Sequence, residues 1–267
     1  MSIEFSDYLK TGDLQGWIAA LSAEVKKNPA DSNRRYLLGQ AHLINGAYDK
    51  ADTHFDLAST NDPSWGPKIA MLRQLVRALK CREECFGEGR APELLKDPSP
   101  YMEALLKANA ALRENDPDTT ALFEAAEALR PASSGKLDGD AFDDFRDLDD
   151  RIAGVVEILT STGKYFWASV SDIRSISFSP VSRPSDIVVR QVEIDVDDGP
   201  TGVVFLPVNY PVSSIDVTDA LKLGLESDWS EGDAPPILGE GRRCIFMNDE
   251  VHAFGQDMLE VEFNGGS

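Results

Sequence analysis

The stretch SNRRYLLGQAHLINGAYDKADTHFDLASTNDP, residues 32–63, decides the fold of the first half of the chain. Small side chains at Gly39 and Ala51 let two antiparallel helices approach closely, and Gly46 turns the chain between them. Pro63 ends the second helix, because proline cannot continue it. The stretch therefore predicts a pair of antiparallel helices that needs neighbouring pairs to bury its apolar faces.

An internal repeat extends this pair toward the N-terminus. Gly12 lies 34 residues before Gly46, and Pro29 lies 34 residues before Pro63; this spacing is the period of tetratricopeptide repeats. Residues 87–100 break the register, so only the first two repeats are regular. Apolar residues that recur three and four positions apart predict helices at 3–11, 13–27, 32–45, 48–60, 67–85, 99–114 and 118–130.

The composition changes after residue 130. Residues 131–140 are small, polar and acidic, which predicts a boundary between a helical domain, 1–130, and a second domain, 135–267. Helical periodicity then continues only over 147–161, where we expect one more helix. Alternating and β-branched runs predict strands at 165–167, 173–178, 187–196, 202–207, 219–229, 243–248, 251–254 and 257–263.

A hairpin gives the second domain its clearest signal. Val192, Ile194 and Val196 alternate with polar residues, and Asp198-Gly199 supplies the turn. Arg190 shares the parity of the apolar residues, and we expect it to snorkel at the sheet edge, with a buried acid as the alternative partner. The expected fold class is α+β with two domains, a tetratricopeptide-like helical array followed by a mixed domain with a largely antiparallel sheet.

Composition excludes several classes of function. The 267 residues include 26 Lys and Arg against 46 Asp and Glu, a formal net charge of −20, which repels nucleic acids and anionic membranes. No apolar run is long enough to span a bilayer and the first residues do not resemble a signal peptide, so we expect a cytoplasmic protein without a membrane partner. Cys81, Cys85 and Cys244 do not suggest a disulfide framework, in keeping with a reducing compartment.

Motifs of common catalytic and cofactor sites are absent from the sequence. It has no phosphate-binding loop, no zinc-protease motif and no nucleophile elbow, so we expect no cofactor and no metal. One constellation could bind a hard cation or act as paired acid and base. It comprises Asp138, Asp140, Asp143, Asp144, Asp147, Asp149 and Asp150. The alternative is a solvated helix start and turn, with Asp147 and Asp149 as caps and Arg151 as an ion-pair partner.

The helical array predicts a groove for a partner. In the repeat that begins at Ser32, the groove positions are Asn33, Tyr36, Gln40 and Leu43. Asn33 and Gln40 would bond to the backbone of a peptide or helix, while Tyr36 and Leu43 would supply apolar area. The alternative is that the array packs on the second domain and buries the groove internally.

The chain from Gly139 onward resembles the ImpE, or TagJ, family of accessory proteins of bacterial type VI secretion systems. The N-terminal repeat is similar to the helical half of that family, so the resemblance covers nearly the whole chain. The residues that carry it, in order and spacing, are Gly12, Pro29, Asp31, Arg35, Gly46, Phe142, Asp147, Asp149, Arg151, Val156, Glu157, Gly163, Tyr165, Trp167, Ile173, Ile176, Pro184, Asp186, Pro207, Tyr210, Pro211, Ser213, Leu223, Trp229, Gly239, Gly241 and Arg243.

Three places depart from the family's pattern. The segment 187–190 lacks the tryptophan that the family tends to have after its proline and acid. Asn209 stands where the family tends to have arginine, and Arg242 stands where it tends to have glutamine. These differences concern the details of a partner surface.

The resemblance implies a cytoplasmic, non-enzymatic adaptor associated with the contractile sheath. It implies contact with the N-terminal helix of the small sheath subunit and assistance to the ATPase that recycles contracted sheath. The partner helix would lie against Tyr36 and Leu43 or against Tyr165 and Trp167. The alternative for Tyr165 and Trp167 is packing in the core. Two other functions stay open, a cation-dependent enzyme that uses Asp138 to Asp150 and a chaperone for basic clients.

Overall fold

Helices form most of the first half of the protein. The computed structural model describes residues 4–211, 217–232 and 234–264. Its α-helices are α1 (Phe5–Thr11), α2 (Leu14–Lys27), α3 (Ser32–Ile44), α4 (Tyr48–Asn61), α5 (Gly66–Gly87), α6 (Pro100–Glu114), α7 (Thr119–Glu127) and α8 (Asp219–Lys222). The seven helices predicted before residue 130 are present, although residue 3, the predicted start of the first, lies outside the described residues.

Side-chain caps explain where several of these helices begin. Asp13 precedes α2 and its carboxylate accepts the N–H of Gly16 at 2.7 Å. Asp31 precedes α3 and accepts the N–H of Arg34 at 2.9 Å. Each carboxylate satisfies a backbone donor that has no partner within the first turn, which stabilises the helix start.

The packing of α3 on α4 depends on the absence of a side chain at Gly39. A Cβ atom there would lie 2.5 Å from the ring of Phe55 on α4, closer than carbon atoms pack. Gly46, in the turn between the helices, has φ +74°, a left-handed conformation that favours glycine. These positions confirm the close approach and the turn predicted from the sequence.

Strands form the scaffold of the second half. They are β1 (Glu93–Leu94), β2 (Gly135–Leu137), β3 (Asp140–Phe142), β4 (Arg146–Asp147), β5 (Val155–Leu159), β6 (Tyr165–Ser169), β7 (Ile173–Phe178), β8 (Val189–Val196), β9 (Thr201–Pro207), β10 (Ser227–Trp229), β11 (Gly239–Gly241), β12 (Cys244–Met247), β13 (Glu250–Ala253) and β14 (Glu260–Phe263). Over the described residues, nine of them make one sheet in the order β1-β6-β5-β9-β8-β7-β14-β2-β3, and two smaller sheets pair β10 with β11 and β12 with β4 and β13. Only β1 and β6 pair in parallel within this part of the chain, so the α+β fold class with a largely antiparallel sheet is confirmed.

The predicted hairpin is strands β8 and β9, with Val192 opposite Val204. The turn closes through a hydrogen bond from the N–H of Gly199 to the carbonyl oxygen of Val196. Arg190 behaves differently from its prediction. Its side chain is buried and donates to the carbonyl oxygens of Gly255 and Ser179, so it does not snorkel into solvent, and it forms no ion pair with an acid in the described part of the chain.

The helix predicted over 147–161 is wrong. The segment instead contains the end of β4, a short 3-10 helix (Asp150–Ile152) and strand β5. Strand β5 is buried on both faces, so its apolar run lacks the alternation that marks a half-buried strand. The strand predicted over 219–229 is also wrong in its first part, because Thr218 caps the short helix α8 there.

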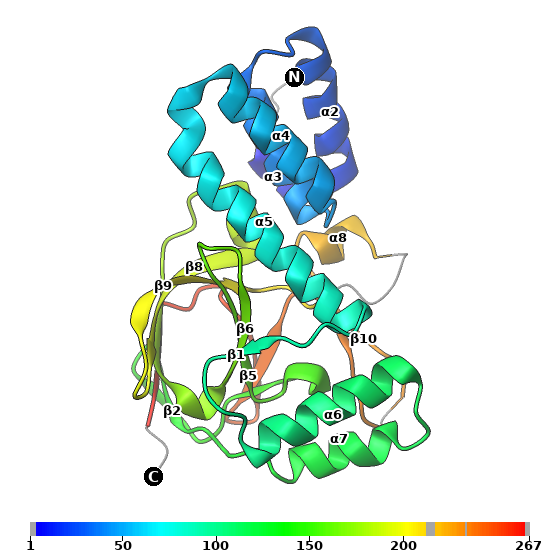
Figure 1. Ribbon diagram of the computed structural model, residues 1–267, viewed down its shortest axis with the longest axis vertical. Coiled ribbons are helices and arrows are strands. Elements are labelled where there is room, and N and C mark those ends of the chain that lie inside the picture. Colours follow the sequence, from blue (N-terminus) through cyan, green and yellow to red (C-terminus); the bar gives the residue numbers. More distant parts are fainter. Residues whose placement is uncertain (1–3, 212–216, 233, 265–267) are drawn as a thin grey trace.

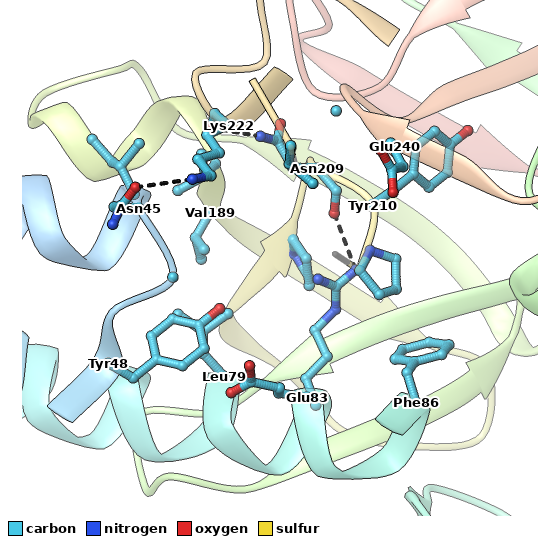
Figure 2. Close-up of a pocket in the computed structure, with 18 of the residues that line it drawn as sticks. Asn45, Tyr48, Leu79, Glu83, Phe86, Val189, Asn209, Tyr210, Lys222 and Glu240 are labelled. Atoms are coloured by element: carbon cyan, nitrogen blue, oxygen red, sulfur yellow. Dashed lines mark hydrogen bonds between the residues drawn. The ribbon is translucent and has the colours of Figure 1, made fainter. Parts of the chain in front are cut away.

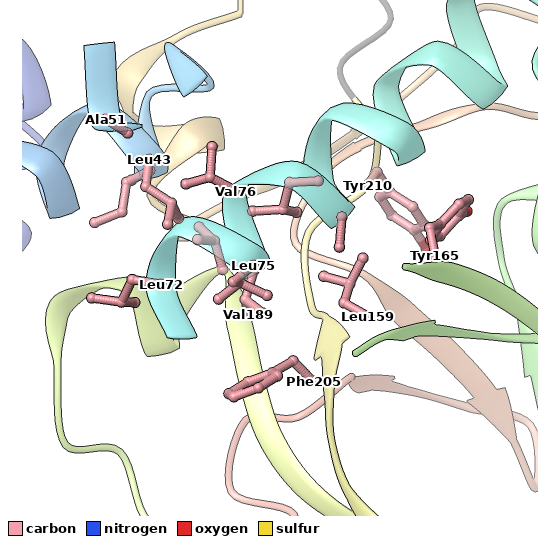
Figure 3. Packing of buried hydrophobic residues seen from close by; sticks show 14 of the residues in the cluster. Leu43, Ala51, Leu72, Leu75, Val76, Leu159, Tyr165, Val189, Phe205 and Tyr210 are labelled. Carbon is pink, nitrogen blue, oxygen red and sulfur yellow. The ribbon is translucent and has the colours of Figure 1, made fainter. Parts of the chain in front are cut away.

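Helix α5 lies between the repeat and the sheet (Figure 1). It has 22 residues and packs on α4 and on strands β5 and β6. Figure 3 shows Leu75 and Val76 of α5 between Leu43 of α3 and the sheet residues Val189 and Phe205, all in one buried cluster. The hydrophobic core is therefore continuous from the repeat to the sheet, while the division at residues 130–135 stays a prediction.

Candidate functional site: a cleft between helix α5 and the sheet

The groove predicted on α3 is covered by the chain itself. Tyr36, Gln40 and Leu43 are 5%, 0% and 2% exposed. The backbone N–H of Ser185, in a 3-10 helix (Pro184–Ile187), donates to Oε1 of Gln40 at 3.0 Å. Asn33 is the one exposed residue of these four, and Leu43, although buried, lines the cleft described below. The partner-binding role of these four residues stays a prediction.

The two aromatic residues of β6 lie inside the protein. Tyr165 and Trp167 are each 3% exposed. Nε1 of Trp167 donates to the Tyr165 hydroxyl, which in turn donates to Oε1 of Glu157, both at 2.5 Å. Burial, with the charge of Glu157 beside it, raises the pKa of Tyr165 well above its ordinary value. Both residues have core contacts here and present no surface to a partner in this conformation.

Glu157 is the centre of a buried ion network. Arg82 of α5 donates to its two oxygens at 2.7 and 2.9 Å, and Arg243 donates to Oε2 at 3.1 Å. Arg243 also pairs with Asp147 at 2.7 Å. Burial opposes ionisation of Glu157, but Arg82 and Arg243 outweigh it and hold its pKa below the ordinary value. The network therefore fixes α5 to the sheet, since loss of one partner would leave a buried charge unpaired.

Most of the aspartates predicted as a catalytic or cation-binding cluster have side-chain contacts within the fold, whereas Asp140 and Asp143 are exposed. Asp147 accepts the N–H of Asp149 at 2.9 Å, and Asp149 accepts both the backbone N–H and the guanidinium of Arg151. These contacts confirm the caps and the ion pair of the alternative, but not its solvated helix start, because Asp147 and Asp149 are 1% and 0% exposed and only a short 3-10 helix follows them. No group of three or more His, Cys, Asp or Glu side chains within 4–211, 217–232 and 234–264 is arranged to hold a metal ion. Further ion pairs join Asp144 to Arg130 and Asp150 to Arg146.

A cleft of about 520 Å³ opens beside this network. One wall is a single face of α5, because Leu79, Glu83 and Phe86 lie three and four positions apart. Figure 2 shows these residues on one side, with Asn209 and Lys222 on the other. The cleft thus brings together the end of α5, the α3–α4 turn, the start of β8, the end of β9, and α8.

The basic and acidic side chains of the cleft differ in their partners within the protein. Two of its basic groups are ion-paired, Arg82 with Glu157 and Arg151 with Asp149, whereas Lys222 donates to the neutral side chain of Asn45 at 3.3 Å. Glu83, in contrast, is exposed and has no ion pair within the part of the chain that the structure describes. Partial burial and then the nearby acids raise the pKa of Glu83. The cleft therefore suits a ligand with an apolar face and a positive charge.

Sequence reasoning did not identify this cleft. Its walls come from segments between Leu43 and Gly241 that only the folded chain brings together. One signal was present, because Phe86 continues the apolar stripe of α5 seven residues after Leu79. Among the resemblance residues near the cleft, Tyr210 and Pro211 contribute to its wall, whereas Ser213 lies outside the described residues.

Hydropathy adds one finding. No helix in the described ranges is both long and apolar enough to cross a membrane.

Comparisons with known proteins give a consistent result. Residues 139–261 match the family model described as ImpE protein. The chain is 26% identical over 264 residues to the type VI secretion system accessory component TagJ of Pseudomonas aeruginosa, covering 96% of this chain and 90% of that protein. The crystal structure of protein VPA1032 from Vibrio parahaemolyticus has a TM-score of 0.89 and 26% identity, over 98% of this chain and 97% of that chain.

Proposed function

The chain belongs to the ImpE/TagJ family, and from this premise we propose that it is a non-enzymatic accessory protein of a bacterial type VI secretion system, acting in the cytoplasm. The observation that carries the proposal is the similarity to TagJ over 96% of the chain. An accessory protein acts through a binding surface and needs no catalytic centre. The internal pairing of Asp147 and Asp149 gives no support to the alternative of a cation-dependent enzyme.

The proposed partner is the N-terminal helix of the small sheath subunit. We propose further that the cleft along α5 receives it, since Leu79 and Phe86 supply an apolar wall and Glu83 a negative charge. An amphipathic helix that docks in a groove presents its apolar stripe to such a wall and its basic residues to the acidic rim. Assistance to the ATPase that recycles contracted sheath would follow from holding this helix.

A calorimetric titration tests both parts of the proposal. A synthetic peptide of the small sheath subunit's N-terminal helix, from the same bacterium, is added to the wild-type protein and to the variants Glu83→Lys and Phe86→Ala. We expect saturable one-to-one binding that is weakened at least about tenfold by either change, as expected for loss of a charged contact or of a large apolar contact. Glu114→Lys, at the exposed end of α6, is the matched charge control and should bind as the wild type does.

The outcomes separate the partner from its site. Binding that survives both cleft substitutions would retain the sheath subunit as partner and reject the cleft. No binding at about 100 μM, which is weaker than about −5.5 kcal/mol, would reject the sheath helix as partner. Circular dichroism of each variant shows whether it is folded, which matters most for Phe86→Ala because this ring packs on Trp167.

A further inference from the structure

A second pocket lies on the opposite face of the strands that line the cleft. At two places neighbouring residues line different hollows: Val189 and Asn209 line the cleft, whereas Arg190 and Val208 line the second pocket. This alternation is the period of two that an extended chain imposes on its side chains. The second pocket measures about 260 Å³ and shares no lining residue with the cleft.

Two arginines line this pocket without a carboxylate partner among the residues that the structure describes. Arg190 is 8% exposed, and its hydrogen bonds go to the backbone carbonyl oxygens of Gly255 and Ser179. Arg242 is partly buried. Neither guanidinium has an ion pair among residues 4–211, 217–232 and 234–264. Two cationic groups therefore face one pocket, and no carboxylate of the described residues lies between them in an ion pair.

The nearby acids do not neutralise these arginines. Asp186, also at the pocket, is held by Arg183 at 2.6 Å and by backbone N–H groups. Asp257 is exposed and influences both arginines only at longer range. Burial lowers the pKa of Arg190 and of Arg242, which reflects the cost of a cation that lacks a close anion.

This situation is unusual for the chain. It carries 46 acidic residues, and other buried arginines have carboxylates at short range. Arg82 lies 2.7 Å from Glu157, and Arg243 lies 2.7 Å from Asp147. Because burial of an unpaired charge is unfavourable, a pocket that keeps two such groups is complementary to an anion.

The remainder of the pocket is apolar, and apolar side chains extend beyond its edge. Phe254 and Leu223 line it, while Val181 and Leu225 at the rim are 58% and 40% exposed. Its volume is below the range of about 300–1,000 Å³ that is typical of small-molecule sites. That size fits one or two side chains of a protein segment, and the exposed rim gives area for the residues beside them.

We propose that this pocket binds a segment of a partner protein in which Asp or Glu stands next to a large apolar residue. The carboxylate would bind Arg190 and Arg242, and the apolar residue would pack on Leu225 and Val181. This surface is separate from the cleft and does not depend on the sheath subunit as partner. The recognised chemistry is also opposite in charge, since the cleft favours a cation.

A random peptide display library tests the proposal with the full-length protein. Wild type, Arg242→Ala and Leu225→Asp are used as baits, and Arg174→Ala is the control because this exposed arginine lies outside the pocket. We expect wild type and Arg174→Ala to enrich peptides in which Asp or Glu adjoins Leu, Ile, Val or Phe. Absence of that pattern on the wild type, or the same enrichment on Arg242→Ala and Leu225→Asp, would overturn the proposal.

Affinity measurements then test the charge and the class of ligand. The best selected peptide is compared with its version in which the acid is replaced by Gln or Asn, and we expect at least about a tenfold loss of affinity. If Arg242→Ala has a folding defect, Leu225→Asp still tests the pocket, because Leu225 is already partly exposed. Hexanoate that binds as tightly as the peptide would overturn the assignment to a protein segment in favour of a small organic acid.

Discussion

Arg82 of α5 and Glu157 of β5 form a two-point ion pair, with N–O distances of 2.7 and 2.9 Å and exposed fractions of 8% and 0%. The residues are far apart in sequence and belong to different layers of the protein. Nη2 of Arg82 also donates to the carbonyl oxygen of Asn209 at 3.0 Å, on the other wall of the cleft. This contact pattern sets the position of α5 relative to the sheet and therefore the width of the cleft.

Removal of Arg82 should strongly destabilise the protein. Arg82→Met leaves Glu157 with the Tyr165 hydroxyl and with Arg243, which it shares with Asp147, and we expect the free energy of unfolding to fall by about 3–5 kcal/mol. The double variant Arg82→Met/Glu157→Met leaves Arg243 and Asp147 as a neutral pair, so it should lose less than the sum of the single changes. Urea unfolding of the four proteins measures the coupling; strictly additive losses would contradict this account.

A methyl group at Gly39 should also be poorly tolerated. Gly39→Ala would place a carbon 2.5 Å from the Phe55 ring, so we expect a loss of about 1–3 kcal/mol in unfolding free energy. Gly66→Ala is the matched control, since no atom lies within 4 Å of a Cβ there and the backbone is helical. That change should be neutral or stabilise by up to about 1 kcal/mol. Equal effects of the two substitutions would argue against close packing of α3 on α4.

Substitutions at the predicted α3 groove should separate packing from binding. Tyr36→Ala removes a ring that lies 5.0 Å from the Trp65 ring and should cost about 3–5 kcal/mol in thermal or urea unfolding. Tyr36→Phe removes a buried hydroxyl that has no hydrogen-bond partner among the described residues, so it should be neutral or slightly stabilising. Asn33→Ala should stay within about 0.5 kcal/mol of the wild type. A large loss in Tyr36→Phe would show that the hydroxyl has a partner in solution.

Acid should weaken the helical repeat through His42. This ring stacks on His54 with centroids 5.5 Å apart, and burial followed by the charge of His54 lowers its pKa to about 4. The unfolded chain binds the proton near pH 6.5, so the stabilising contribution is complete above that pH and is lost as pH falls toward 4.

The variant His42→Phe keeps an aromatic ring on His54 but cannot take up a proton. Its urea midpoint should therefore fall less between pH 7 and pH 4 than that of the wild type. If the urea midpoint of the variant falls between pH 7 and pH 4 by as much as that of the wild type, the acid sensitivity belongs to other groups.

The sequence predicts those elements that are specified by residues close together in the chain. Asp31 caps a helix whose apolar residues repeat every three to four positions, and Val192, Ile194 and Val196 alternate before the Asp198-Gly199 turn. Both patterns depend on neighbouring residues alone. Strand β5 could not be predicted in this way, because both of its faces are buried and its residues, VVEIL, do not alternate between apolar and polar.

The candidate site depends on contacts that no local pattern records. Phe86 and Leu79 had the spacing of a helix face, but the opposite wall is more than a hundred residues away in the chain. Likewise, Tyr36 and Gln40 have the positions expected of groove residues, and only the fold shows that Ser185 covers Gln40. Periodicity identifies which face of a helix is apolar and not which segment buries it.

The continuity of α5 determines how a mechanical load would travel through the protein. A helix of 22 residues is about 33 Å long at 1.5 Å per residue, and no flexible hinge interrupts it between the repeat and the sheet. A force applied to the repeat would act directly on packed side chains and on the Arg82–Glu157 pair. A flexible linker in place of α5 would first extend before it transmitted the force. A displacement of one end of the protein would then be transmitted to the other end with little loss.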